Sequence, residues 1–485
     1  MSAANKVKSP VIKVDLNAED MRLLLTKQKE AWLANGIPDY ATRINRVDRL
    51  IALLVDNKDE IAATLSGDYG RRSLEGSLFL DVLYVVNVLK YNKVHLGEWM
   101  KPELHEAPFP DAVARVEFQP KGVVGVVSPW NFPWTLAFGP IADIFAAGNV
   151  CMLKPSELAP RTSALMGQLV SQFFHETEIT VLQGGPETGA AFAALPFDHL
   201  IYTGGTKIGA AIMGAAEKNL TPVTLELGGK SPVLVGRTAD IGDVARRVMT
   251  VKTFNAGQIC LAPDYILLPK GSEDKFVAFA TRAVHDMYGA LKENGDYTSI
   301  INERHFNRLR SWTEDAKRKG ARVIEVNPAG EDFASSDLHR LPPTLILDVN
   351  DEMTVMQEEI YGPLLPIKTY DNIEEAITYV RNHPSPLALY YFGNDFAEER
   401  LVIDGTTSGG VTINDCMAHI SVNSLPLGGI GPSGMGAYRG KTGFLTFSHA
   451  RSIYRQSRSP QAEHLLRPPF GSQTRAFLSA AITRA

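Results

Sequence analysis

From residue 122 onward, short apolar runs rich in β-branched residues alternate with longer helical stretches, and this alternation limits the fold more than any other feature. The apolar runs occupy residues 122–127, 149–153, 179–183, 199–203 and 223–227. Apolar residues recur at helical spacing between them, over residues 135–148, 160–174, 187–194 and 206–219. Because strand–helix–strand units with short Gly-rich joints place their strands parallel, the sequence predicts a doubly wound parallel sheet.

A second alternating series follows the pair Gly228-Gly229. Its predicted strands lie at residues 233–236, 265–268, 344–349, 366–370, 387–393 and 409–414. Its predicted helices lie at residues 240–256, 272–289, 303–319, 372–382 and 395–404. A chain of 485 residues is too long for one ordinary core, and two adjacent glycines permit a turn between domains. The fold class is therefore predicted to be α/β, with a second α/β domain after the first.

The predicted domain boundaries follow from these two series. The first domain takes residues 1–101 and 120–229, with residues 416–450 packing back on it, and the second takes residues 230–415. Helical spacing over residues 19–66 belongs to the first domain. The segments 102–119 and 451–470, which contain predicted strands at 114–120 and 451–455, form a small β arm. Residues 471–485 form a C-terminal tail.

Composition excludes several classes of function. The net charge of −5 is unlike the basic footprint of a nucleic-acid-binding protein. The richest apolar run, residues 78–89, holds twelve residues, too few to span a bilayer, and is predicted to be a buried helix. The N-terminal residues carry no apolar signal core. Three widely separated cysteines indicate free thiols in a reducing compartment and suggest no metal site, so we expect a cytoplasmic protein without membrane or nucleic-acid partners.

The stretch FNAGQICLAPDY, residues 254–265, places Cys260 directly after a predicted turn at Gly257-Gln258. A lone cysteine in a reducing compartment is usually a small apolar core residue, and this reading is favoured for Cys151, Cys260 and Cys416 alike when each is taken alone. Cys260 is a nucleophile only if the rest of the chain supplies a base, an oxyanion donor and a cofactor.

Two polar residues stand at the ends of predicted strands. Glu226 lies in the apolar run VTLEL, where a carboxylate is unfavourable unless it is paired, protonated or functional, and desolvation should raise its pKa toward the range of a general base. A structural ion-pair partner is the competing interpretation. Asn131, between Pro129 and Pro133, is placed to donate from its amide to an oxyanion, whereas most loop asparagines only cap turns.

Two further segments have the composition of a phosphate and ribose site. Gly204, Gly205, Thr206 and Gly209 stand between a strand and a helix, where backbone N–H groups at a helix N-terminus accept a phosphate. A tight turn without ligand is favoured there when the segment is read alone. Lys154 and Glu157 follow another strand and are able to bind ribose hydroxyls, with a surface ion pair as the alternative.

Taken together and in this order, the segments PWNFP, KPSE, TGGTKIG, ELGGK, GQIC, EEIYGP and LPLGGIGPSGMG resemble the aldehyde dehydrogenase superfamily over residues 19–455. GQICLAPDY and GPSGMGAYRGKTGFLTFSH resemble its class 3 and coniferyl-aldehyde dehydrogenase branch. The resemblance implies a first domain that binds NAD, a catalytic second domain and an oligomerisation arm. It also implies an aromatic or medium-chain aldehyde as substrate, oxidised to a carboxylic acid through a cysteine thiohemiacetal and thioester.

The resemblance implies a role for each matching position. Cys260 is the nucleophile, Glu226 the general base and Asn131 the oxyanion-stabilising residue. The implied cofactor-binding residues are Trp130, Lys154, Glu157, Gly204, Gly205, Thr206, Gly209, Leu227, Glu359 and Tyr361. NAD is the expected cofactor because Glu157 repels a 2′-phosphate, with NADP tolerated. The branch favours a homodimer, with a tetramer as the alternative.

Three positions depart from residues common in the family. Gly205 leaves only backbone contacts to a pyrophosphate, and Leu427 and Trp134 are expected to affect the substrate pocket. Two other functions compete with aldehyde oxidation to the acid. A coenzyme-A-acylating enzyme passes the thioester to a thiol, which the presence of Glu226 disfavours. A non-catalytic structural relative would lack Cys260, Glu226 or Asn131, and all three are present.

Overall fold

The computed structural model describes residues 13–14, 16–333, 338–459 and 467–483, and these form three sheets. The first sheet has the order β1-β6-β5-β4-β7-β8-β16. Its strands are β1 (Lys13–Val14), β4 (Val123–Val127), β5 (Val150–Lys154), β6 (Ile179–Gln183), β7 (His199–Thr203), β8 (Val223–Glu226) and β16 (Gly434–Met435). All pairs are parallel except β16 with β8.

Helices cover both faces of this sheet, because successive strand residues point to opposite sides. Val124 and Val126 of β4 lie in one hydrophobic cluster and Val123 lies in another. The first cluster is covered by α2 (Tyr40–Asp56), α3 (Lys58–Tyr69), α5 (Tyr84–Trp99), α6 (Pro133–Ala147) and α7 (Pro160–Phe173). The second is covered by α1 (Ala18–Asn35), α8 (Pro186–Ala193) and α9 (Thr206–Glu217). The predicted doubly wound sheet is confirmed.

The second sheet has the order β11-β12-β13-β10-β9-β14-β15. Its strands are β9 (Pro232–Val235), β10 (Tyr265–Pro269), β11 (Arg322–Glu325), β12 (Thr344–Leu347), β13 (Leu364–Tyr370), β14 (Ala388–Phe392) and β15 (Gly410–Ile413). One face packs on α10 (Ile241–Thr253) and α11 (Glu273–Tyr288). The other packs on α12 (Glu303–Arg318), α14 (Ile373–Arg381) and α15 (Phe396–Gly405). The second predicted α/β unit is therefore also confirmed.

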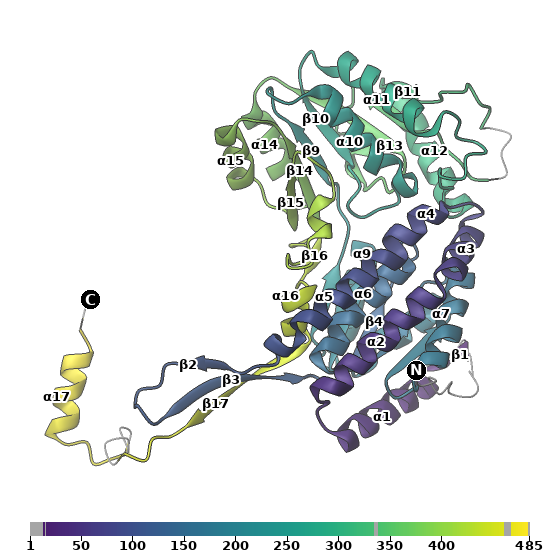
Figure 1. The fold of residues 1–485 in the computed structure, drawn as a ribbon. Helices are drawn as coiled ribbons and strands as arrows, with labels where there is room; N and C mark the ends of the chain where they lie inside the picture. Colours follow the sequence, from purple (N-terminus) through teal and green to yellow (C-terminus); the bar gives the residue numbers. More distant parts are fainter. Residues whose placement is uncertain (1–12, 15, 334–337, 460–466, 484–485) are drawn as a thin grey trace.

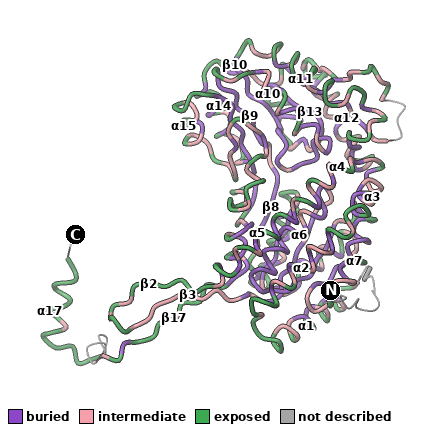
Figure 2. Tube along the Cα trace, viewed as in Figure 1, coloured by how far each residue is buried: buried purple, intermediate pink, exposed green. Residues whose placement is uncertain are grey.

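A third, antiparallel sheet projects from the body of the molecule (Figure 1). It joins β3 (Val113–Pro120) to β2 (Glu103–His105) and β17 (Ser448–Arg455), so both strands predicted for the arm are present. The helix α17 (Ser472–Ala481) beyond it has no buried side chain, and β2 and most of β17 are exposed, whereas β3 between them is half-buried (Figure 2). Part of the predicted arm, residues 460–466, lies outside the described residues.

The apolar run at residues 78–89 is helical but is not fully buried. It begins as a six-residue π-helix, η1 (Leu78–Leu83), after α4 (Leu74–Ser77), and continues into α5. Phe79 and Leu83 are 63% and 46% exposed, because they face away from the core that holds Val85 and Leu89. Of the helices in the described residues, none combines the length and the apolar character needed to cross a membrane.

Candidate active site

The first sheet reverses its winding between β4 and β7. The chain proceeds from β4 to β5 and β6 on one side, and β7 and β8 continue on the other side. Ligands of open α/β sheets bind outside the carboxyl ends of the strands at such a point. The next residue after β4 is Ser128 and the last of β7 is Thr203, and both hydroxyls are buried without a partner among the described residues. The edge of β4 and β7 therefore offers unfilled hydrogen-bonding capacity to a ligand.

The turn that presents Cys260 is built from three successive left-handed residues. The sequence predicts a helix through residue 256, but α10 ends at Thr253 and Asn255, Ala256 and Gly257 take φ values of 49°, 51° and 71°. A Cβ on Gly257 would lie 2.3 Å from the carbonyl oxygen of Gly362, so only glycine permits this approach. Such conformations persist only where their surroundings hold them, and they concentrate at functional sites.

Gln258, two residues before Cys260, fixes this turn from inside. Its side chain is fully buried, and its amide nitrogen donates to the carbonyl oxygens of Asn255 at 2.9 Å and Ser299 at 3.1 Å. Its amide oxygen accepts from the backbone N–H of Ile301 at 3.0 Å. The role of Gln258 is not evident from the sequence, because its buried hydrogen bonds join residues that only the folded chain brings together.

Glu226 ends β8 and is 4% exposed. Burial raises the pKa of its carboxyl group to about 8, as the sequence predicts, and no cation is among the causes of the shift. Its Oε1 atom has no hydrogen-bond partner within the described chain. The structural ion pair that competed with the general-base interpretation is absent from the described residues.

Asn131 follows β4 and is 1% exposed. Its amide nitrogen donates to the carbonyl oxygen of Gln258 at 3.2 Å, which brings it to the turn that carries Cys260. An amide nitrogen carries two hydrogens, so this bond leaves one of them for another acceptor.

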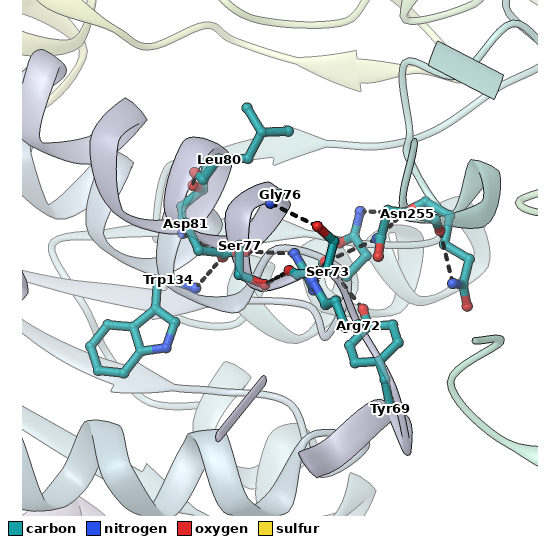
Figure 3. A network of polar contacts seen from close by, with 12 residues as sticks. Tyr69, Arg72, Ser73, Gly76, Ser77, Leu80, Asp81, Trp134 and Asn255 are labelled. Carbon is teal, nitrogen blue, oxygen red and sulfur yellow. Dashed lines mark hydrogen bonds and ion pairs between the residues drawn. The ribbon is translucent and has the colours of Figure 1, made fainter. Parts of the chain in front are cut away.

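The backbone of Asn131 is held by a buried ion pair that the sequence analysis did not find (Figure 3). Arg72 donates to the Asn131 carbonyl oxygen at 2.7 Å and to Asp81 at 2.6 Å. Asp81, in η1, also accepts from the backbone N–H of Trp134 at 3.1 Å, in the first turn of α6. The hydroxyl of Tyr69 donates to the same Asn131 oxygen at 3.1 Å. These contacts fix the loop that carries the proposed oxyanion donor.

One apolar pocket brings Cys260, Glu226, Thr203 and Leu227 together. Its wall also includes Leu80, Tyr84, Phe132, Thr135, Leu136, Ile259, Leu261, Leu387, Met417, Ile420, Leu427, Tyr438 and Arg439. Leu427 therefore lines the pocket as expected. The expectation for Trp134 is wrong: its ring is fully buried and stacks on Phe138, with centroids 5.2 Å apart.

Cys260 is a neutral thiol in this state. Burial raises its pKa to about 12, and the nearby carboxylates of Glu359 and Glu226 add to the shift. The backbone N–H groups of Cys260 and Leu261 oppose it. Cys151 and Cys416 are buried in hydrophobic clusters on the two sheets, so of the three cysteines only Cys260 lines the pocket.

The predicted phosphate and ribose segments lie at the same edge of the first sheet. Gly205 precedes α9 as its N-cap and offers no side chain to the first turn of the helix, so that turn is open to an anion. A Cβ on Gly209 would lie 2.6 Å from Leu227, so this glycine allows α9 to pack closely. Lys154 is 3% exposed, with its amino group 3.5 Å from Glu157.

The other predicted positions in this segment have structural contacts of their own. The backbone N–H of Gly204 donates to the carbonyl oxygen of Glu226 at 3.0 Å. The hydroxyl of Thr206 donates to the carbonyl oxygen of Pro432 at 3.2 Å. These bonds connect the start of α9 to β8 and to the Gly-rich segment before β16.

The last three predicted cofactor-binding residues, Glu359, Tyr361 and Trp130, also have contacts within the protein. The Glu359 carboxylate lies against Gly228, where a Cβ would come within 2.2 Å of Oε2. Burial and the neighbouring Asp264 raise the pKa of Glu359 to about 8. The rings of Trp130 and Tyr361 meet edge to face, with centroids 5.5 Å apart. In the part of the chain that the structure describes, no group of three or more His, Cys, Asp or Glu side chains could hold a metal ion.

Comparison with known proteins agrees with this architecture. The chain is 54% identical over 468 residues to the coniferyl aldehyde dehydrogenase of Pseudomonas sp. strain HR199, covering 96% of this chain and 97% of that protein. The substrate-bound structure of Staphylococcus aureus AldH superposes with a TM-score of 0.90 at 31% identity, covering 96% of this chain and all of that one. The indole-3-acetaldehyde dehydrogenase of P. syringae, solved with NAD⁺, gives a TM-score of 0.82 at 25% identity, covering 90% of this chain and 89% of that one.

These similarities identify an oxidoreductase that oxidises aldehydes with a nicotinamide cofactor. The model of the aldehyde dehydrogenase family matches residues 14–453, which is nearly the whole chain. The chain belongs to the aldehyde dehydrogenase family.

Proposed function

We propose that the protein oxidises an aromatic aldehyde of the coniferyl type to its carboxylic acid, with Cys260 as nucleophile, Asn131 as oxyanion donor and Glu226 as the base that activates water. The observation that carries the proposal is the single apolar pocket shared by Cys260 and an unpaired, buried Glu226 carboxyl group. Apolar walls suit an aromatic ring, and the 54% identical coniferyl aldehyde dehydrogenase supports this substrate class.

The chemistry follows from the positions of these side chains. The Cys260 thiol releases its proton to solvent and its sulfur attacks the aldehyde carbon, which places a negative charge on the former carbonyl oxygen. The free N–H of the Asn131 amide donates to that oxygen. A nicotinamide cofactor, when bound, would accept the hydride from the former aldehyde carbon, which leaves a thioester on Cys260. Glu226, in its ionised form, takes a proton from the water that hydrolyses the thioester.

The residues present fit a dinucleotide. The open first turn of α9 and Gly205 would receive the pyrophosphate, and Lys154 with Glu157 would hold the adenosine ribose. Glu359 would hold the nicotinamide ribose. The partnerless hydroxyls of Ser128 and Thr203 are polar groups at this edge that a bound ligand or its water would satisfy.

Incubation with an aldehyde panel tests the function. Coniferyl aldehyde and cinnamaldehyde should reduce NAD with a higher kcat/KM than hexanal, and the free acid should appear without coenzyme A. An acyl product that requires coenzyme A would establish the acylating alternative. Absence of NAD and NADP reduction with every aldehyde would establish the non-catalytic one.

We further propose that NAD is preferred and NADP tolerated. Glu157 is 41% exposed beside Lys154, where its carboxylate would accept from a ribose 2′-OH and repel a 2′-phosphate. Glu157→Gln should therefore lower the ratio of kcat/KM for NAD to kcat/KM for NADP by about tenfold, since hydrogen bonds to charged groups contribute about 1.5–3 kcal/mol. Initial rates with the two cofactors measure the ratio. A wild-type enzyme with the higher kcat/KM for NADP would contradict the proposal.

We propose a cytoplasmic homodimer assembled through the predicted arm, residues 102–119 and 451–470. The exposed three-stranded sheet and α17, which buries no side chain on its own chain, support an arm that packs on a second copy (Figure 2). Sedimentation equilibrium distinguishes the dimer from the tetramer and from a monomer.

A further inference from the structure

Arg439 is a buried cation in the wall of the substrate pocket. It is 2% exposed and lines the same pocket as Cys260 and Glu226. It stands as the N-cap of α16 (Gly440–Thr446) with a φ of 91°, which is a strained conformation for a residue with a side chain. Strain at a buried, pocket-lining residue indicates a functional constraint on its position.

The guanidinium of Arg439 has no anionic partner among the described residues. Its Nη2 atom donates to the hydroxyl of Tyr84, and the cation lies over the Tyr84 ring, 5.2 Å from the centroid. Its Nη1 atom has no partner in the described chain. Asp143 accepts from the backbone N–H of Arg439 at 2.8 Å, not from the guanidinium. Burial lowers the pKa of Arg439 to about 10.

Arg439 is the one buried arginine among the described residues that lines this pocket. Arg340, which is also buried, keeps its Nε and Nη2 atoms without partners away from the pocket, whereas two others bond to acceptors of the protein. Arg72 pairs with Asp81 and with a backbone carbonyl oxygen. Arg43 donates to the carbonyl oxygens of Pro38 at 3.0 Å and Ala146 at 2.9 Å. A buried charge is costly unless it is paired, so the missing acceptor at Arg439 is best supplied from the pocket.

Arg439 differs from the other polar groups of the pocket wall in its charge. The hydroxyl of Thr135 already donates to the carbonyl oxygen of Leu80. The hydroxyl of Thr203 has no partner among the described residues, but it is neutral. Among the residues that line the pocket, Arg439 therefore supplies the only cationic group for a substrate oxygen.

We propose that Arg439 binds the phenolic oxygen of a 4-hydroxylated aromatic aldehyde and favours its ionised form. The inference rests on the proposed oxidation of aromatic aldehydes and names the substituent that the pocket selects. The carbonyl group of a conjugated 4-hydroxy aldehyde withdraws electrons from the ring and makes the phenol more acidic. An unpaired guanidinium would therefore stabilise the phenolate. An unsubstituted ring leaves the same cation without an acceptor.

Paired substrates measure this selectivity. The ratio of kcat/KM for 4-hydroxycinnamaldehyde to kcat/KM for cinnamaldehyde should exceed one in the wild type and fall at least about tenfold in Arg439→Met. Arg439→Lys should keep part of the ratio. Arg43→Met is the matched control, because it removes a buried arginine outside the pocket and should leave the ratio unchanged. Equal losses with both substrates in Arg439→Met would show a merely structural role and overturn the proposal.

A second readout does not depend on turnover. The absorbance of 4-hydroxycinnamaldehyde bound to Cys260→Ala reports ionisation of the phenol, which should occur at lower pH than in free solution. The double variant Cys260→Ala/Arg439→Met should lose this shift, and identical titration in both proteins would overturn the proposal. If the Arg439 variants do not fold, Tyr84→Phe serves instead, because it keeps the guanidinium and removes the hydroxyl that accepts from Nη2. This variant should preserve both the ratio of kcat/KM values and the shift in phenol ionisation. Loss of both in Tyr84→Phe would also overturn the proposal.

The proposed function and this inference fail differently. Oxidation of aromatic aldehydes with no preference for the hydroxylated ring overturns the role of Arg439 and leaves the proposed function intact. Oxidation of aliphatic aldehydes alone overturns the aromatic assignment, and the inference with it.

Discussion

Cys260→Ala should lower kcat/KM for aldehyde oxidation by at least about 10⁴-fold, because removal of a nucleophile abolishes the covalent route and leaves only binding and oxyanion stabilisation. Binding of NAD should survive, since the predicted cofactor contacts lie on α9, on the segment after β5 and on Glu359. Initial rates of NADH formation measure the loss, and fluorescence titration with NADH measures cofactor binding.

The chain offers matched controls for this variant. Cys151→Ala and Cys416→Ala also remove a buried thiol, but neither cysteine lines the pocket. Their kcat/KM should stay near that of the wild type, although the small cavity left in each core should lower the melting temperature. Comparable losses of activity in all three variants would contradict the assignment of Cys260.

Glu226→Gln should lower kcat by about 10²–10⁴-fold, the usual contribution of general acid–base catalysis, while acylation of Cys260 continues. Rapid mixing with NAD should then give a burst of NADH equal to the concentration of active sites, followed by a very slow steady state. Absence of both the burst and the steady state would mean that Glu226 acts before hydride transfer, contrary to its proposed role in hydrolysis.

The pH profile gives a second test of Glu226. Burial raises the pKa of its carboxyl group to about 8, so the base is ionised above that pH and neutral below it. When hydrolysis limits the rate, kcat should therefore rise as pH increases through about 8. Glu359 has a similar raised pKa of about 8, which makes Glu359→Gln the informative control. The rising limb should persist in Glu359→Gln and disappear in Glu226→Gln.

The sequence predicted both layered sheets because their strands are continuous apolar runs buried on two faces. The edge strand β11 was missed, since Arg322 and Glu325 at its two ends are exposed and its pairing is set by β12, not by its own composition. The predicted helix through residue 256 was too long. Ala256 is a good helix former, and its left-handed conformation depends on tertiary contacts such as the approach of Gly257 to Gly362.

The site was predictable where a residue contradicted its local surroundings. A glutamate in an apolar strand indicated Glu226 without any knowledge of its neighbours. The hydrogen bond from Arg72 to Asn131 joins residues 59 positions apart, and neither position departs from an ordinary local pattern. Arg439 is likewise unremarkable in sequence, because its lack of an anionic partner exists only once α5 and α16 are packed. Whether a buried side chain lacks a hydrogen-bond or ion-pair partner depends on the packing of distant segments, so it cannot be predicted from the local sequence.

The proposed nucleophile and base belong to different halves of the molecule. Glu226 ends a strand of the first sheet, Cys260 precedes a strand of the second, and the chain crosses between the sheets at Gly228-Gly229. The distance between the Cys260 sulfur and the Glu226 carboxylate therefore depends on how the two sheets pack together. A substitution that shifts one sheet against the other would change this distance without altering either side chain.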